Sequence, residues 1–457
     1  MAQMSQAGDL TSGPMLKKII LFSLPLAASS FLQLLFNAAD VVVVGRFVGS
    51  AALAAVGSNG ALINLLVNLF VGLALGANVV AARCYGAKDD QGVHEAVQTA
   101  VTLSLVGGVL MAFVGFFAAH GLLELMSSPE DVIDLATLYL KIYFIGMPMT
   151  MLYNFNASLL RAVGDTRRPL VCLAVAGVIN VVLNLLFVIV FQMSVAGVAL
   201  ATILSQILSA SLAFRRLTRT RACYRVNWRL IRFEGPMLRQ VVTLGIPSGV
   251  QSSVVSLANV IVQANINAFG SAAMAGCGAY SKIEGFAFLP VTCFALALST
   301  FVSQNIGARR FDRVRQGMKF GLICSPVLAE LIGVAIFTLA PFLIALFNSD
   351  PTVVSFGVDD ARTVSLFYCL LSFSHCCAGI LRGMGRPVVP MAIMLCVWCA
   401  LRITYITVTV HFIPDIHVVY WAYPLTWAIS SVLFLFCLRR MRFPSEEHGE
   451  PVSYIRG

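Results

Sequence analysis

The sequence has little charge. Only 11% of its 457 residues are Asp, Glu, Lys or Arg, whereas soluble domains carry roughly 25%. Hydrophobic residues make up 59% and the mean hydropathy is +0.87, so polar side chains are too few to cover a water-soluble core of this size. Apolar windows of about 20 residues or more instead recur along the chain, which is typical of transmembrane helices. The composition therefore excludes a soluble globular protein.

Motifs of catalysis are also missing. The chain contains no HExxH, Walker loop or GxSxG sequence, so we predict that it is not an enzyme and needs no cofactor. A membrane-embedded enzyme would require His375, Glu284 and Lys282 to converge in one pocket. The twelve cysteines fall mostly within apolar windows, and we interpret them as small packing residues rather than as a disulfide framework.

The apolar windows predict an all-α integral membrane protein with twelve transmembrane helices. In the first half the windows cover residues 16–44, 51–80, 93–119, 132–158, 168–192 and 195–217. In the second half they cover residues 238–268, 272–303, 314–345, 353–380, 387–412 and 418–438.

The net charge of +10 reports the orientation of these spans. Lys and Arg gather before span one, between spans six and seven and after spans two, four, eight, ten and twelve, whereas the opposite connections carry mostly acids and histidines. By the positive-inside rule, both termini are then cytoplasmic. Because the positive charge follows topology, we expect no nucleic-acid partner.

The chain repeats itself at an offset of about 222 residues. Five stretches recur in the same order, including "VGSAALAAVG" (48–57) with "FGSAAMAGCG" (269–278) and "SLLRAVGDTRRP" (158–169) with "GILRGMGRP" (379–387). Six spans per repeat give both halves the same orientation, so they should form two six-helix lobes related by a pseudo-two-fold axis along the membrane normal. The predicted parts are a cytoplasmic tail (1–15), an N-lobe (16–217), a basic cytoplasmic linker (218–237), a C-lobe (238–440) and a polar tail (441–457).

An aspartate, Asp40, ends a polar face on the first span. Ser30, Gln33, Asn37 and Asp40 are spaced 3, 4 and 3 residues apart and therefore share one helix face. Spans two, five, six and seven carry similar faces. Such residues can form hydrogen bonds between helices or line a wet cavity, and the many amides in the first half favour the cavity. A carboxylate inside a membrane span is by default a functional residue.

In their order along a duplicated twelve-span chain, several motifs resemble those of the multidrug and toxic compound extrusion (MATE) family. The motifs are "LP" early in span one, "DVVVVG" at its end, "GAK" and "GAR" after spans two and eight, and "LR…G…P" after spans four and ten. The resemblance covers residues 15–440 and is closer to the prokaryotic DinF-like branch. It implies export of organic, often cationic, compounds against an inward Na⁺ or H⁺ gradient.

The resemblance also implies an ion site in the N-lobe, formed by Asp40, Asn180, Asn184 and Thr202. DinF-like members commonly have a second carboxylate where this chain has Asn184. One carboxylate, two amide oxygens and a hydroxyl suit Na⁺, a hard cation that prefers oxygen ligands. A lone carboxyl group out of water also favours its protonated form, so H⁺ is the preferred coupling ion and Na⁺ stays open.

The second half offers no acidic counterpart, because the positions equivalent to Asp40 lie between Asn259 and Val262. Pro25 and Pro247 align in the repeat and are candidate helix bends. Glu284 either pairs with Lys282 at a helix end or contacts substrate or protons, and Arg402 either snorkels to the interface or faces the cavity. The residues predicted to line the substrate cavity are Gln33, Asn37, Asn64, Asn68, Gln206, Asn259, Gln263, Glu284 and Arg402.

Together these observations predict an efflux antiporter that exchanges small organic, mainly cationic, substrates for H⁺ or Na⁺ through Asp40. We expect a monomer in the lipid bilayer of a prokaryotic cytoplasmic (inner) membrane. The alternative is a flippase for lipid-linked sugar or cell-wall precursors, although such proteins tend to have extra spans and cavities rich in Arg and Lys.

Overall fold

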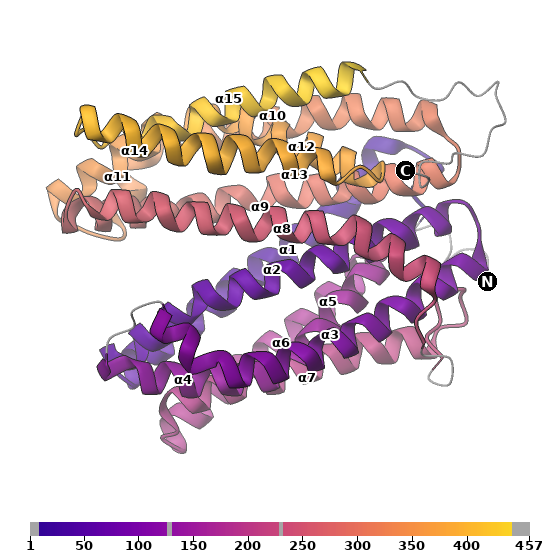
Figure 1. Cartoon of the computed structure of the whole chain (residues 1–457), viewed down its shortest axis with the longest axis horizontal. Coiled ribbons are helices and arrows are strands. Elements are labelled where there is room, and N and C mark those ends of the chain that lie inside the picture. Colours follow the sequence, from indigo (N-terminus) through magenta and orange to yellow (C-terminus); the bar gives the residue numbers. More distant parts are fainter. Residues whose placement is uncertain (1–8, 126–129, 228–231, 441–457) are drawn as a thin grey trace. The chain divides into compact units, whose positions relative to one another are not determined.

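The computed structural model describes residues 9–125, 130–227 and 232–440. The outer part of the predicted N-terminal tail, the predicted tail 441–457 and four residues of the predicted linker lie outside these ranges. The described residues form helices and contain no strand (Figure 1). The chain is an all-α membrane protein with eleven helices long and apolar enough to span a bilayer, or twelve when one bent pair counts as a single span.

The helices of the first repeat follow the predicted windows with small differences at their ends. They are α1 (Met15–Phe47), α2 (Ser50–Gly86), α3 (Asp90–Leu125), α4 (Glu130–Ile145), α5 (Met147–Ala162), α6 (Arg167–Leu185), the π-helical turn η1 (Leu186–Val190) and α7 (Ser194–Arg219). The fourth predicted span is the bent pair, because α4 and α5 meet at Gly146 with an angle of 51°.

The second repeat is more broken. Its elements are α8 (Gly235–Asn267), α9 (Ser271–Gly307), α10 (Phe311–Ala345), α11 (Pro351–Val364), the 3₁₀ turn η3 (Ser365–Phe367), α12 (Tyr368–Gly383), α13 (Val388–Met394), the π-helical turn η4 (Leu395–Leu401), α14 (Arg402–Phe412) and α15 (His417–Arg440). The C-x-x-C sequence of Cys396 and Cys399 falls inside η4, and both thiols are free.

The backbone repeats as the sequence does. Left-handed φ angles occur at three pairs of positions, 49 and 270, 88 and 309, and 164 and 385. The members of each pair are 221 residues apart and have similar φ angles, for example 86° at Gly164 and 82° at Gly385. Four of these six positions are glycine, the residue that adopts this conformation without a steric penalty. The connections between spans are therefore duplicated along with the spans.

Two helices cross between the two compact units of the chain. One unit contains Leu24–Gly249, and the other contains Leu10–Ser23 together with the chain from Val250 to the end of α15. Helix α1 therefore begins in one unit and continues in the other, and α8 does the same in the opposite sense. Each crossing lies within three residues of a proline inside the helix, Pro25 or Pro247, where the backbone lacks one helical hydrogen bond.

A short segment before α1 is held by the second unit. The N–H of Leu10 donates to Oε1 of Gln304 at 3.0 Å, and Nδ2 of Asn305 donates to the carbonyl of Leu10 at 3.3 Å. Arg313 donates through Nη1 to the carbonyl of Gly13 at 3.0 Å. Because Gln304 and Asn305 are fully buried, these bonds satisfy groups that would be costly to leave unpaired.

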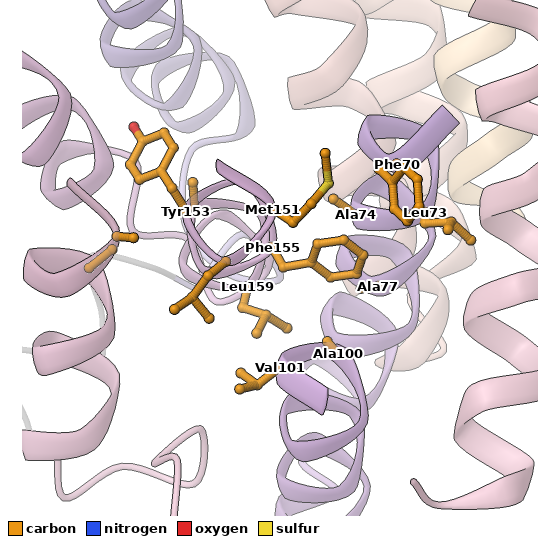
Figure 2. Packing of buried hydrophobic residues seen from close by; sticks show 14 of the residues in the cluster. Phe70, Leu73, Ala74, Ala77, Ala100, Val101, Met151, Tyr153, Phe155 and Leu159 are labelled. Carbon is orange, nitrogen blue, oxygen red and sulfur yellow. The ribbon is translucent and has the colours of Figure 1, made fainter. Parts of the chain in front are cut away.

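The core of the first unit is built from α2, α3 and α5. Figure 2 shows Met151 and Phe155 of α5 pointing toward Ala74 and Ala77 of α2. The alanines leave room for the long side chains, so the helices pack closely without the hydrophobic driving force that water would supply. This core fixes the frame against which α1, α6 and α7 present their polar residues.

Candidate functional site

Asp40 lies in the last two turns of α1 and is half-buried. The preceding residues of its polar face, Gln33 and Asn37, are exposed. The face therefore changes along the helix from exposed amides to a carboxylate that is partly withdrawn from solvent. A carboxylate in this position requires polar partners, because burial penalises its charge.

Two asparagines of α6 supply these partners. Nδ2 of Asn184 donates a hydrogen bond to Oδ1 of Asp40, and it also contacts Oδ1 of Asn180 at 3.3 Å. Asn184 and Asn180 are 1% and 5% exposed. Since they are four residues apart, they lie one helical turn apart on the same face of α6. The structure thus brings together three of the four residues predicted for the ion site.

The fourth residue, Thr202, is directed elsewhere. Its hydroxyl donates to the carbonyl of Val198, one turn back in α7, at 3.0 Å. Among the described residues no hydrogen bond joins Thr202 to Asp40 or to either asparagine. Its lone pairs stay available to a ligand, but the hydroxyl is not part of the bonded cluster.

The acceptor side of Asn184 has no partner. Its Oδ1 is buried and accepts no hydrogen bond from the described residues. A buried amide oxygen left unpaired costs about 1–3 kcal/mol. The carboxylate of Asp40 and this oxygen lie on the same amide–carboxylate pair, so together they offer oxygen ligands suited to a hard cation or a proton. The described residues contain no cluster of three or more His, Cys, Asp or Glu side chains that could hold a resident metal ion.

The floor beneath Asp40 is apolar. Val43 and Val44, the next turn of α1, pack in a buried cluster with Tyr139 of α4 and Val188 of η1. Tyr139 also lies within electrostatic range of Asp40. The π-helical turn η1 begins two residues after Asn184, and such turns occur frequently at functional sites. An apolar floor limits hydration and strengthens electrostatic interactions within the site.

Helices α1 and α6 approach closely because one residue between them is glycine. A Cβ atom on Gly177 would overlap the ring of Phe36. Phe36 precedes Asp40 by one turn, and Gly177 precedes Asn180 by three residues. The glycine therefore sets the separation at which Asn184 reaches Asp40.

We expect Gly177→Val to weaken transport more than folding. The ring of Phe36 must move, at a cost of about 1–3 kcal/mol, which separates α1 from α6 and lengthens the contact between Asp40 and Asn184. Efflux per folded molecule should fall by about tenfold, as measured in vesicles with the protein amount checked by size-exclusion chromatography. Gly121→Val in α3 is the control, because a Cβ there meets nothing within 4 Å; equal losses in both variants would contradict the explanation.

The residues predicted to line the substrate cavity differ in exposure. Gln33, Asn37, Asn64 and Asn259 are exposed, Asn68, Gln206, Gln263 and Glu284 are partly buried, and Arg402 is buried. Gln206 accepts a hydrogen bond from Ser209 and Gln263 donates to Asn267, both within their own helices. Exposed amides within spans are poorly suited to lipid, which favours contact with water.

Other buried amides serve packing. Nδ2 of Asn59 donates to the carbonyl of Ala136 at 2.9 Å, and Nδ2 of Asn78 donates to the carbonyl of Ser158 at 2.8 Å. These bonds join α2 to α4 and α5 within the first unit. Part of the amide content is therefore explained by hydrogen bonds between helices.

The second unit contains an acid that the sequence reasoning missed. Asp360 of α11 is only 6% exposed and lies among Gly357, Ala361 and Val364 on the buried face of its helix. Its spacing from those small and apolar residues was the available signal. Glu284 lies within electrostatic range of both Asp360 and Arg402.

The enzyme hypothesis finds no support in the second unit. His375 packs edge-on against Phe288 and Trp398, with ring centroids 5.9 and 5.5 Å away. Lys282 is exposed. Among the described residues no hydrogen bond or ion pair links His375, Glu284 and Lys282, so the three do not form a bonded constellation.

Comparison with known proteins gives concordant matches. The family model described as MatE matches residues 25–186 and again residues 247–407. The probable multidrug resistance protein YpnP of Bacillus subtilis (strain 168) is 30% identical over 403 residues, covering 87% of this chain and 89% of that protein. YoeA, another probable multidrug resistance protein of the same organism, is 27% identical over 425 residues, covering 91% and 92%.

The solved structures agree on the fold. An outward-facing multidrug resistance MATE family transporter of the MOP superfamily superposes with a TM-score of 0.88 at 21% sequence identity. The match covers 95% of this chain and 98% of that one. At this identity the likeness concerns the architecture of two six-helix lobes.

Proposed function

Because this chain belongs to the multidrug and toxic compound extrusion (MATE) family, we propose that it is a secondary active efflux antiporter coupled through Asp40. It exports small organic compounds, mainly cations, in exchange for H⁺ or Na⁺. It acts as a monomer in the cytoplasmic membrane of a prokaryote, with both termini in the cytoplasm. The names of YpnP and YoeA, both probable multidrug resistance proteins, support efflux of several compounds.

One observation carries the coupling role. Asp40 accepts a hydrogen bond from Asn184, whose own amide oxygen is buried without a partner. The pair has one negative charge and one unsatisfied acceptor above an apolar floor, so it gains when a cation or proton arrives. A group whose charge compensation changes with the bound ion can couple ion entry to substrate release.

H⁺ is the favoured coupling ion. The site has a single carboxylate, and the two asparagines contribute no charge. One negative charge and neutral oxygens compensate a desolvated Na⁺ less well than two carboxylates would. A proton needs only the carboxylate itself, and it leaves the hydrogen bond from Asn184 available to the other oxygen.

In the proposed cycle, an organic cation and the coupling ion use Asp40 alternately. The ion enters from the outside, neutralises the carboxylate and removes the attraction for the bound organic cation, which leaves to the outside. The ion then departs to the cytoplasm and restores the negative charge for the next substrate. Since both ligands draw on one charge, simultaneous binding is unfavourable.

Reconstituted vesicles test the function. The purified chain is placed in vesicles loaded with a fluorescent organic cation, and an inward H⁺ or Na⁺ gradient is imposed in separate experiments. Efflux should require the H⁺ gradient and should stop when an ionophore collapses it. Dye movement that ignores both gradients would overturn the antiporter proposal, and translocation of a fluorescent lipid-linked sugar in its place would favour the flippase.

We expect Asn184→Asp to increase the response to Na⁺. The change places a second carboxylate beside Asp40, and two adjacent carboxylates cannot both ionise without a cation. The Na⁺ concentration for half-maximal efflux should fall by about tenfold or more, the size of a change of about 1.4 kcal/mol in binding free energy. Asn64→Asp, at an exposed position in α2, is the control. An unchanged Na⁺ response in Asn184→Asp would show that Asn184 is not part of the ion site.

A further inference from the structure

The second unit buries an arginine in the middle of a membrane span. Arg402 begins α14 directly after the π-helical turn η4, within the span Val388–Phe412, and is 2% exposed. A charged side chain at the centre of a bilayer is costly and is normally paired or functional. Its surroundings should therefore contain a compensating charge.

The nearest partners of Arg402 are neutral. Its Nε and Nη2 donate to Oγ1 of Thr426 at 3.1 and 2.8 Å. The guanidinium also lies over the rings of Tyr423 and Trp398, 4.4 and 5.7 Å from their centroids. A hydroxyl and two aromatic faces satisfy donors and stabilise a cation, but they do not cancel its charge.

The compensating charge is Glu284. The carboxylate of Glu284 on α9 and the guanidinium of Arg402 act on each other electrostatically. Among the described groups that influence Glu284, Arg402 is the one cation. Charges separated by several ångströms still interact appreciably where water is scarce.

Other titratable groups surround Glu284 without supplying a positive charge. Tyr280 of α9 and Tyr368 of α12 share a hydrogen bond of 2.8 Å near it. The remaining neighbours are Asp360 of α11, which faces Cys277, and Tyr423 of α15. Two more lie on the helices packed around α9: Glu330 of α10 accepts from the N–H of Cys369, and His375 of α12 stacks on Phe288 and Trp398.

The repeat places Arg402 where the first unit has an ion-site residue. Gly164 and Gly385, 221 residues apart, mark equivalent points before α6 and α13. The π-helical turn η4 accommodates one additional residue before Arg402. Arg402 then corresponds to Asn180, and Ile406, which is 1% exposed, corresponds to Asn184.

We propose that Arg402 is a built-in cation of the second unit, which neutralises Glu284 in place of an external ion. The second repeat keeps the general plan of a buried site but carries its positive charge covalently. The inference deepens the proposed function, because it explains why coupling is confined to Asp40 in the first repeat. Arg402 thereby acts as a positioning residue for the charge of Glu284, and it does not itself bind the transported ion.

Removal of the guanidinium should expose Glu284 to protonation. In Arg402→Gln, the carboxyl group keeps its buried surroundings and loses its cation, so it favours the neutral form. The conservative Arg402→Lys keeps a positive charge and should behave like the parent. These expectations hold in the absence of any transported substrate.

Difference infrared spectroscopy tests the charge state directly. The full chain carrying Asp40→Asn is purified in detergent, so that the first-repeat carboxylate does not contribute, and the carbonyl band of protonated carboxyl groups is followed against pH. Arg402→Gln should gain such a band at neutral pH, Arg402→Lys should not, and adding Glu284→Gln should remove it. A spectrum unchanged by Arg402→Gln, or a new band that survives Glu284→Gln, would overturn the proposal.

A stability cycle covers the case in which Arg402→Gln folds poorly. Removing one partner of a buried charge pair is more damaging than removing both. Arg402→Gln and Glu284→Gln should each lower the melting temperature in detergent, and the double variant should recover part of the loss. Additive losses, or a double variant that also fails to fold, would contradict the pairing. Neither experiment measures transport, so a failure here is distinct from a failure of coupling through Asp40.

Discussion

Asp40→Asn is expected to give a folded protein that no longer uses an ion gradient. Asparagine has nearly the shape of aspartate and can keep a polar contact with Asn184, whose amide now bonds to Asp40, but it has no charge to exchange between ion and substrate. Gradient-driven efflux should fall by at least about tenfold, equivalent to about 1.4 kcal/mol. The measurement is dye efflux from vesicles under an imposed H⁺ gradient, at matched protein content.

Glu124→Gln is the matched control for this prediction. Glu124 lies in α3 of the same repeat, its side chain is 62% exposed, and it pairs with His120 at 3.1 Å. Exposed pairs of this kind contribute about 0–1 kcal/mol, so efflux should be nearly unchanged. Full gradient-driven efflux by Asp40→Asn would show that the coupling charge lies elsewhere.

Gly249→Val is expected to cause a severe loss of folded protein. Helices α2 and α8 touch through their backbones at a row of glycines that includes Gly72, Gly76, Gly245 and Gly249. A Cβ on Gly249 would lie 2.9 Å from Cα of Leu69 and as close to its carbonyl. Backbone atoms cannot move aside as a side-chain tip can, so we expect a cost of about 3 kcal/mol or more, measured as a lower melting temperature in detergent.

The control for Gly249→Val is Gly60→Val. Gly60 is a residue of α2 as well, but a Cβ there meets nothing within 4 Å. The two variants add the same side chain to helices of the same contact pair and differ in the space available. A Gly249→Val protein that melts with the Gly60→Val protein would show that the glycine row does not hold α2 against α8.

The twelve spans could be predicted because each is a long apolar window, and lipid requires every backbone group within it to be hydrogen-bonded. The irregular parts could not. The bend of 51° at Gly146 and the π-helical turns η1 and η4 leave no mark on hydropathy. They depend on how neighbouring helices pack, which a single window does not contain.

The candidate site was predictable to the same extent. The pairing of Asp40 with Asn184 and Asn180 follows from polar residues in apolar spans. The direction of Thr202 does not, because a threonine hydroxyl in a helix can bond to its own backbone, as it does with Val198. Asp360 was missed because the analysis of acids concentrated on connections, and its burial becomes clear only from the packing of α11.

The exchange of helix segments between the two units bears on how such a chain could have arisen. Each repeat gives the beginning of its first helix to the other unit, as Leu10–Ser23 and the first fifteen residues of α8 do here. A single six-span ancestor would have lacked that segment, unless a second copy supplied it. The arrangement is that of a domain-swapped dimer, later joined by the linker between α7 and α8. Halves of this chain expressed as separate polypeptides should therefore fold together rather than alone.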